Sequence, residues 1–224
     1  MLFFFLITLI NSFLRLLKGR FKKVCISYPC YKWIEKFLRV GETEQYRTTN
    51  LVKALPRTIR VGISTSLPSA YVTALDEALA RYNAQGLKLT FKRVTSKADV
   101  TFTKAPSTAA YLASAGFPMN NGNPYKSVSV NSVYLGTNPP TAYLATILAH
   151  ELGHCIGFRH TDYMDRSYSC GGAVANEGAS SVSAVHIPGT ATAQDPNSWM
   201  LACISDGENR PFNANDRTAL NYLY

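Results

Sequence analysis

The sequence predicts an α+β fold, in which a twisted mixed β-sheet carries two long helices and is followed by a largely irregular C-terminal part. Three observations lead to this prediction. Strand and helix patterns alternate over residues 58–105, a long apolar helix pattern begins after Pro140, and little periodicity remains over residues 161–197. At 224 residues, the chain has room for one domain of ordinary size.

The first part of the pattern reads strand, helix, strand, strand. TIRVGIS at 58–64 alternates apolar and polar residues, and helical spacing over 70–83 ends before Gly86, a typical helix stop. LKLTFKRV at 87–94 and ADVTFTKA at 98–105 are the next two predicted strands. A helix between neighbouring strands requires a crossover connection, so the sheet is expected to be partly parallel.

The second part contains a loop, a strand and two further helices. Residues 106–126 are rich in Ser, Gly, Asn and Pro and are predicted to be a loop, whereas SVSVNSVYL at 127–135 alternates like a strand. Two prolines then start the helix TAYLATILAHELGHCIGF. The ending NANDRTALNYLY predicts a short terminal helix, which either Asn213 or Asn215 can cap.

The positive charge is confined to one end of the chain. Residues 1–60 carry 12 Lys or Arg and three acidic residues, whereas residues 61–224 carry 11 of each. The balanced body argues against a nucleic-acid-binding face. We assign residues 1–45 as a separate apolar and basic segment, which is a signal or anchor, an interfacial amphipathic segment, or a non-native start. Membrane association would involve residues 1–23, and we expect an extracellular or cell-envelope location.

The stretch HELGHCIGFRH carries the residues best suited to chemistry. His150 and His154 are four apart on a helix, so both imidazoles project from one face and can reach one metal ion. Glu151 lies one step round and can flank the metal without binding it. Gly157 can adopt the left-handed conformation that ends the helix, which lets His160 supply a third nitrogen. Three protein ligands leave a tetrahedral zinc ion one position for water, as in catalytic sites.

Chance explains this set poorly. With four His and 14 Gly in the chain, a random match to all five fixed positions has a probability on the order of a few in a million. A closed structural zinc site with Cys155 as the fourth ligand is the main alternative. Cys155 follows His154 directly, however, and so points about a quarter turn away from it.

These five positions resemble the HExxHxxGxxH pattern of the metzincin metallopeptidases. In that clan a methionine lies in a tight turn below the zinc, and SWMLA places Met200 suitably here. The longer strings HELGHCIGFRHTDY, RSYSCGG and DPNSWMLAC are similar to the bacterial dual-action HEIGH metallopeptidases. The resemblance covers roughly residues 46–224 and implies a metzincin-type catalytic domain, with a backing helix and an active-site helix on the sheet, an irregular lower subdomain with the Met-turn, and a C-terminal helix.

The implied activity is that of a zinc-dependent endopeptidase. One catalytic zinc ion would be held by His150, His154 and His160, with Glu151 as the general base that activates its bound water. A peptide or protein substrate would lie extended along an edge strand, for which 127–135 is the candidate, and a monomer is expected. The alternative is a catalytically silent metal-binding adhesion or interaction module of the same fold, against which the intact glutamate argues.

The chain departs from some metzincins in the lower subdomain. Astacins and serralysins carry a Tyr at the position of Ala202, so a tyrosine switch is doubtful, and Tyr163 is a candidate replacement donor. His186 is expected to be an ordinary loop residue, with substrate contact or a second metal left open. A calcium site has no supporting ligand spacing, although acidic residues are available in the long loop: Asp162, Asp165, Glu177 and Asp195.

The five cysteines cannot all pair within one chain. In an oxidising compartment we expect Cys170 to pair with Cys203 and Cys155 to stay free, because Cys155 is fixed on the active-site helix. A Cys155–Cys170 pair is the alternative. Cys25 and Cys30 lie in the N-terminal segment, and neither belongs to a recognisable motif for blocking zinc.

Overall fold

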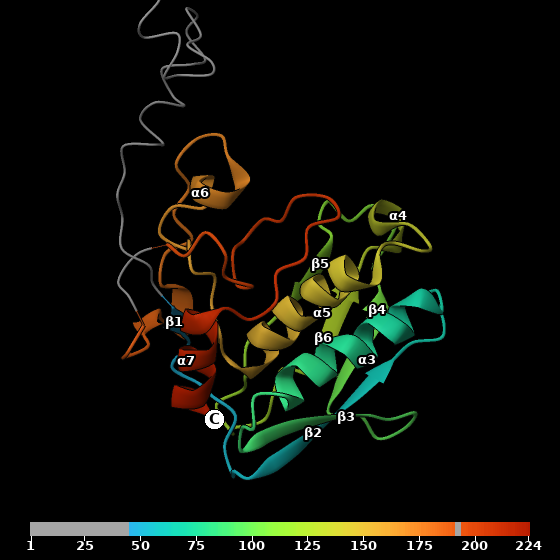
Figure 1. Ribbon diagram of the computed structural model, residues 1–224, viewed down its shortest axis with the longest axis horizontal. Coiled ribbons are helices and arrows are strands. Elements are labelled where there is room, and N and C mark those ends of the chain that lie inside the picture. The colour runs from blue at the N-terminus through green and yellow to red at the C-terminus, as the bar shows by residue number, and fades with distance from the viewer. Residues whose placement is uncertain (1–44, 191–193) are drawn as a thin grey trace, which may run out of the picture. The chain divides into compact units, whose positions relative to one another are not determined.

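A computed structural model describes residues 45–190 and 194–224 of the chain, and a five-stranded sheet forms its centre (Figure 1). The strand order is β3-β2-β4-β6-β5; β3, β2, β4 and β6 are paired in parallel, and β5 is antiparallel. The mixed sheet predicted from the sequence is therefore confirmed. Its strands, in chain order, are β2 (Arg57–Ile63), β3 (Leu89–Arg93), β4 (Val100–Lys104), β5 (Ala113–Ala115) and β6 (Ser127–Val130).

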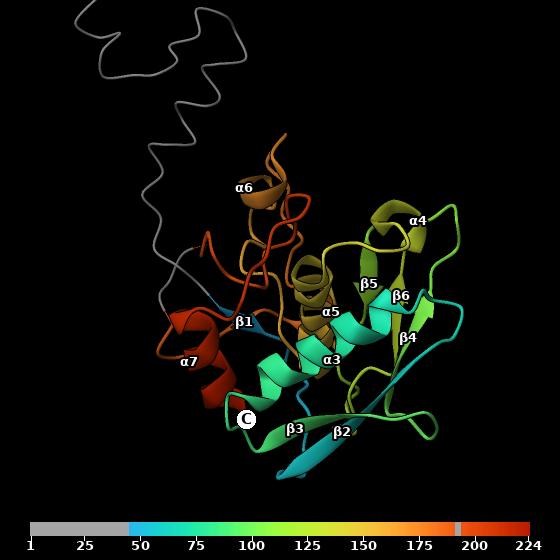
Figure 2. The ribbon, with the colours of Figure 1, turned by 45° about the vertical axis from the view of Figure 1, so that its right-hand side comes forward.

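Two helices, α3 (Ala70–Asn83) and α5 (Thr141–Ile156), lie side by side over one face of this sheet (Figures 1 and 2). The hydroxyl of Tyr82 in α3 donates a hydrogen bond of 2.8 Å to the main-chain carbonyl of Ala149 in α5. From Tyr143 to the end of α5 every residue except His150 is buried. The core therefore surrounds α5 and holds its backbone in place. The position of a side chain that projects from α5 toward solvent, such as that of His150, is fixed by this packing.

The sequence prediction is wrong in one region, next to the sheet edge. Residues 106–126 were expected to be a loop, but they contain β5, and β5 rather than the segment 127–135 is the edge strand on that side. Strand β6 ends at Val130 and the short helix α4 (Ser132–Leu135) follows. The reason is Asn131, whose side chain accepts hydrogen bonds from the main-chain N–H groups of the first helical turn and so caps α4.

The lower part contains only short elements before the last helix. They are β1 (Tyr46–Arg47), α6 (Ser167–Cys170), the 3₁₀ helix η2 (Ser180–Val182) and β7 (Val185–His186), and β1 pairs antiparallel with β7. Helix α7 (Ala214–Leu223) ends the chain, and the Tyr224 hydroxyl hydrogen-bonds the carbonyl of Ile156 at the end of α5. The predicted terminal helix is therefore confirmed, and it is tied directly to α5.

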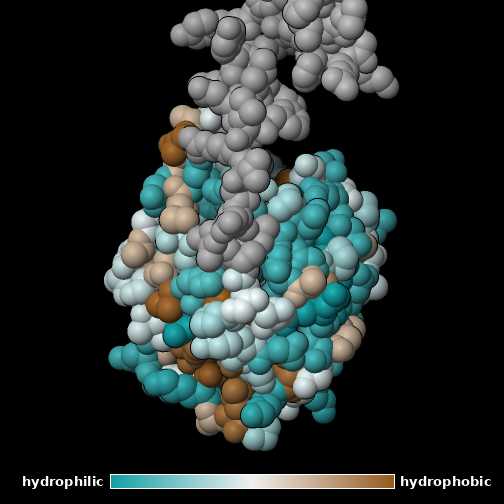
Figure 3. All heavy atoms as spheres, turned by 60° about the vertical axis from the view of Figure 1, so that its left-hand side comes forward, coloured by the Kyte–Doolittle hydropathy of each residue, from teal (hydrophilic) through white to brown (hydrophobic). Residues whose placement is uncertain are grey.

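The surface seen in Figure 3 is mostly hydrophilic, with hydrophobic side chains in small groups. Among the described residues, no helix combines the length and apolarity that crossing a membrane requires. The predicted N-terminal segment, its membrane association and Cys25 and Cys30 lie outside the described residues, which begin at Gln45.

The cap of α7 gives a test of the fold. The Asn213 side chain accepts a hydrogen bond of 2.9 Å from the Asp216 N–H, and the Asp216 carboxylate accepts one from the Asn213 N–H. Asn213→Ala should lower the free energy of unfolding by about 0.5–2 kcal/mol in urea denaturation, because this capping box is lost. Asn221→Ala, on the exposed face of the same helix, is the control and should change it by less than about 0.5 kcal/mol. Equal effects would contradict the capping role.

Candidate metal centre

The end of α5 brings three histidines together. His150 and His154 project from the same face of the helix, and Gly157 ends it with a left-handed φ of 116°. A Cβ at this glycine would lie 2.6 Å from Leu51, so both conformation and space require glycine. The reversal returns the chain past the helix and places His160 beside the other two rings.

The three histidine side chains converge through their Nε2 atoms. Nε2 of His160 lies 3.2 Å from that of His150 and 3.1 Å from that of His154. A tetrahedral zinc ion with Zn–N bonds of about 2.0–2.1 Å keeps its nitrogen ligands about 3.3 Å apart. Among the residues that the structure describes, this is the only group of His, Cys, Asp or Glu side chains that could hold a metal ion.

The opposite nitrogen of each ring determines which tautomer is present. Nδ1 of His150 lies 2.8 Å from the Trp199 carbonyl, and Nδ1 of His154 lies 2.8 Å from the Phe158 carbonyl. A carbonyl can only accept, so Nδ1 carries the proton in both rings and Nε2 keeps a lone pair. His160 has the same arrangement, with Nδ1 2.6 Å from a carboxylate oxygen of Glu177. Lone pairs that converge in this way repel one another, and a cation between them removes the repulsion.

Desolvation keeps both helical histidines neutral, although His150 is only partly buried, and metal binding requires the neutral form. Desolvation and the neighbouring His160 lower the pKa of His150 to about 3. Desolvation, followed by the neighbouring imidazoles, places the pKa of His154 well below its usual value. Protons therefore compete weakly with a metal ion for these two nitrogens at neutral pH.

Glu151 is buried beside the histidines, with only 5% of its surface exposed. Its Oε2 atom has no hydrogen-bond partner, although the residue lines the same cleft as the three histidines. Burial raises the pKa of this carboxyl to about 8. A dication held by the histidines would oppose this rise by charge attraction. The arrangement places a carboxyl group among the cleft-lining residues, next to the three imidazoles.

The turn that contains Met200 forms the floor beneath the helix. A Cβ at Gly153 would lie 2.6 Å from the Met200 sulfur, so the turn packs directly against α5 where a side chain is missing. The Met200 N–H donates to the Ser198 hydroxyl at 3.1 Å, and Thr161 N–H donates to the Met200 carbonyl at 3.0 Å. The structure thus places Met200, fully buried, below the histidines. The preceding Trp199 supplies the carbonyl that orients His150.

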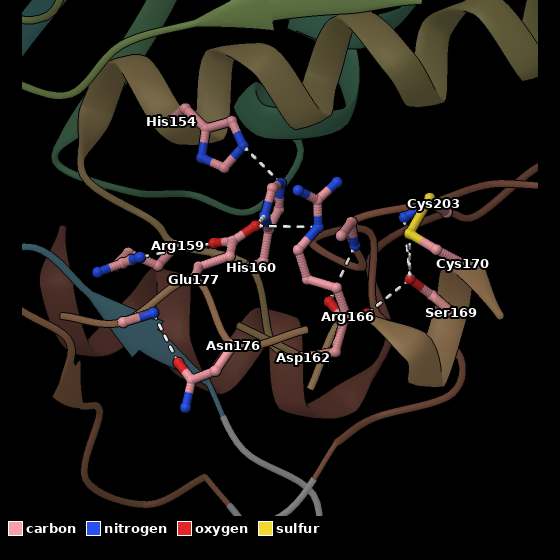
Figure 4. A network of polar contacts seen from close by, with 12 residues as sticks. His154, Arg159, His160, Asp162, Arg166, Ser169, Cys170, Asn176, Glu177 and Cys203 are labelled. Atoms are coloured by element: carbon pink, nitrogen blue, oxygen red, sulfur yellow. Dashed lines mark hydrogen bonds and ion pairs between the residues drawn. A yellow bond between two sulfur atoms is a disulfide. The ribbon is translucent and has the colours of Figure 1, made fainter. Parts of the chain in front are cut away.

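A loop carboxylate, Glu177, completes the surroundings of His160 (Figure 4). Besides the histidine, its oxygens lie 3.2 Å from Nε of Arg166 and 3.5 Å from Nη2 of Arg159. Burial tends to raise its pKa, but the hydrogen bond to His160 and the nearby cationic groups outweigh burial and leave the pKa below its usual value. From its sequence context, Glu177 was a candidate only for a calcium site. No spacing rule marks it, since it lies in the unpatterned stretch after the motif.

The histidines open into a cleft of about 470 Å³ between the sheet edge and the lower part. Strand β5 forms its upper rim and α5 its back wall. The cleft is also lined by the segment 201–204, which follows the Met-containing turn, and by Arg166 and Arg210. The lining residues include Tyr111, Ala113, Ser114, Ala115, Phe117, Tyr134, Ile147, Arg166, Leu201, Ala202, Ile204 and Arg210.

Two candidates from the sequence lie elsewhere. The Tyr163 ring packs edge-on against Tyr46 with centroids 4.5 Å apart, and it is not among the described residues that line the cleft. His186 lies in β7, where its Nε2 is 3.2 Å from the Thr190 hydroxyl, also away from the cleft lining.

The acidic residues that were candidates for a calcium site each hydrogen-bond to different partners. Asp162 accepts hydrogen bonds from the Ala202 N–H and Ser169, Asp165 from Ser167, and Asp195 from Asn213. They do not form a common site with Glu177 among the described residues.

The disulfide prediction is confirmed. Cys170 and Cys203 are bonded, with Cα atoms 5.0 Å apart, and Cys155 is free and buried in α5. The bond joins α6 to the segment after the Met-containing turn, close to the polar network around Glu177 (Figure 4). The alternative Cys155–Cys170 pair is excluded.

A mixed sheet with a three-histidine cluster on its long helix, an unpartnered carboxylate and an open cleft defines a metal-dependent hydrolase of the HExxH type. The chain belongs to the dual-action HEIGH metallopeptidases, whose sequence model matches residues 34–224. It is therefore a metallopeptidase, and its family implies a metal, usually zinc. The match includes residues 34–45, which were expected to belong to a separate N-terminal segment.

Two structures of myroilysin are among the solved structures that are similar to this chain. One has a TM-score of 0.48 at 14% identity, covering 80% of this chain and 96% of myroilysin. The other has a TM-score of 0.48 at 16% identity, covering 75% of this chain and 83% of the other. A comparison with curated protein sequences gives no match.

The raised pKa of Glu151 predicts a pH-dependent stability. In the folded chain the carboxyl keeps its proton up to about pH 8, against 4.5 when unfolded. Its contribution is therefore fully present below 4.5 and is lost as the pH rises through about 8. After metal removal with a chelator, the wild type should lose up to about 1.4 kcal/mol of unfolding free energy per pH unit across this window, relative to Glu151→Gln. Urea titrations across the window measure this, and a pH-independent difference would contradict it.

Proposed function

We propose that this metallopeptidase is a zinc-dependent endopeptidase in which His150, His154 and His160 hold one zinc ion and Glu151 is the general base. The observation that carries the proposal is the convergence of three Nε2 lone pairs at separations that fit tetrahedral zinc, next to an unpartnered buried carboxylate oxygen. A silent binding module would not need to maintain such a carboxylate, whose burial costs about 1–3 kcal/mol.

The chain's own residues would divide the work of peptide hydrolysis. When bound, the zinc ion supplies a Lewis acid for the scissile carbonyl and lowers the pKa of water. Glu151, which lines the cleft, takes a proton on its carboxylate from the attacking water and passes it to the leaving amine. The Nδ1 hydrogen bonds keep the three imidazoles in the required tautomer and orientation.

The substrate of a peptidase is a peptide or protein, and strand β5 is suited to bind it in an extended form. The Leu112 carbonyl accepts a hydrogen bond of 2.8 Å from the Asn131 N–H, so Leu112 faces β6. Main-chain groups alternate along an antiparallel strand, and those of Ala113 and Ala115 therefore face away from β6, toward the cleft that both residues line. Their small side chains leave room for an added strand.

We also propose that the enzyme acts outside the cytoplasm, secreted or attached to the cell envelope. The Cys170–Cys203 disulfide supports this location, since such bonds persist in oxidising compartments.

Glu151→Gln should separate metal binding from chemistry. The amide keeps the shape of the side chain but cannot take the proton, so cleavage of an unstructured protein should fall by about 10²–10⁴-fold. Zinc content, measured by metal analysis, should stay near that of the wild type, because the three imidazoles are intact. His154→Ala is the matched variant and should lose zinc and activity together. Near-normal cleavage by Glu151→Gln would mean that another group is the base, and loss of its zinc would mean that Glu151 is a ligand.

A proline in β5 tests the substrate strand. Ala113→Pro removes a main-chain N–H that faces the cleft, without removing the ladder hydrogen bonds made by the neighbouring residues. The loss of one hydrogen bond to the substrate should raise KM by about 2- to 10-fold, with kcat little changed. Steady-state kinetics on a peptide measure both constants, and an unchanged melting temperature and zinc content serve as controls. An unchanged KM would place the substrate elsewhere.

A further inference from the structure

We propose that Glu177 is the positioning residue for the third metal ligand: it fixes the tautomer and orientation of His160, and it thereby links the loop after the motif to zinc affinity. The inference rests on the proposed zinc site.

The three histidines differ in what holds their rings. His150 and His154 stand on the buried helix α5 and donate to main-chain carbonyls. His160 lies beyond the end of the helix, and the partner of its Nδ1 is a side chain, the Glu177 carboxylate, at 2.6 Å. A carboxylate partner also makes the imidazole a stronger donor to the metal than a carbonyl does. The ligand with the least support from its own backbone therefore has the strongest hydrogen-bond partner.

Glu177 can perform this task because it is itself held in place. Its N–H donates to the Tyr163 carbonyl at 2.8 Å, and its carboxylate lies against Arg166 and Arg159. The Arg159 side chain is buried and donates to the carbonyls of Ala179 at 2.8 Å and Ser183 at 2.9 Å. Two cations thus direct the carboxylate toward His160, and Figure 4 shows the group between them.

A second reading of the same contacts is that Glu177 only anchors the loop through its ion pairs. The two readings differ in what they change. An anchor affects the stability of the fold, whereas a positioning residue affects the zinc dissociation constant of the folded protein. Removing a partner of this kind typically weakens metal binding by about 10- to 100-fold.

The test measures zinc affinity by competition with a chromophoric chelator. Glu177→Ala should bind zinc about 10- to 100-fold more weakly than the wild type, and Glu177→Gln, which keeps an acceptor but loses the charge, should be intermediate. Glu208→Gln is the matched control. Glu208 forms an ion pair with Arg210 at 2.9 Å and, among the described residues, makes no hydrogen bond or ion pair with a histidine, so the zinc affinity of this variant should equal that of the wild type. Arg166→Gln breaks one ion pair but keeps the hydrogen bond to His160, and its affinity should change by less than about 3-fold.

A spectroscopic signature separates the readings even where Glu177→Ala does not fold. The Nδ1 proton of His160 in the zinc-loaded wild type should resonate far downfield in NMR spectra because of its carboxylate partner, and in Glu177→Gln it should move upfield. Wild-type zinc affinity in the Glu177 variants, or an unmoved proton signal in Glu177→Gln, would overturn the inference. A wild type that binds no zinc would instead overturn the proposed function.

Discussion

Everything at this centre depends on where the Nδ1 protons of three imidazoles go. Each proton is directed away from the cluster, and the acceptors are the Phe158 carbonyl, the Trp199 carbonyl and the Glu177 carboxylate. Because these three acceptors, from three separate segments, hold the protons on Nδ1, the lone pairs of all three Nε2 atoms are left to converge. The reversal after α5, the turn under the helix and the long loop must all be in place before any metal ligand is complete.

The C-terminal helix belongs to this arrangement although it contributes nothing to the cleft. Asp216, at the start of α7, accepts hydrogen bonds from the Ser198 hydroxyl at 2.8 Å, from the Trp199 N–H at 3.3 Å and from Gln45. These bonds hold the turn whose carbonyl orients His150. Helix α7 thus supports the metal centre indirectly: the buried Asp216 carboxylate holds the turn, and the turn orients His150.

Sequence reasoning succeeded where the local pattern and the tertiary role agree. The spacing in α5 and the glycine after it place three histidines together, and burial patterns locate β2, α3 and the terminal helix. It failed where tertiary contacts decide. Strand β5 is Ala-Ser-Ala, without β-propensity, and forms because β6 offers a partner. Asn131 interrupts an alternating run that looks like a strand, since its side chain caps a helix. Glu177 has no fixed spacing from His160, because a loop of any length can return a carboxylate.

Without a bound metal ion, the groups that would perform the chemistry lower the stability of the fold. Glu151 is buried without a partner for Oε2, and the Nε2 lone pair of His160 faces those of His150 at 3.2 Å and His154 at 3.1 Å. A divalent cation offsets both effects, since it attracts the carboxylate and replaces repulsion between nitrogens by coordination. Metal binding and folding are therefore coupled through the site itself. The buried helix α5 and the Cys170–Cys203 bond supply the stability that lets the chain keep an arrangement of this kind.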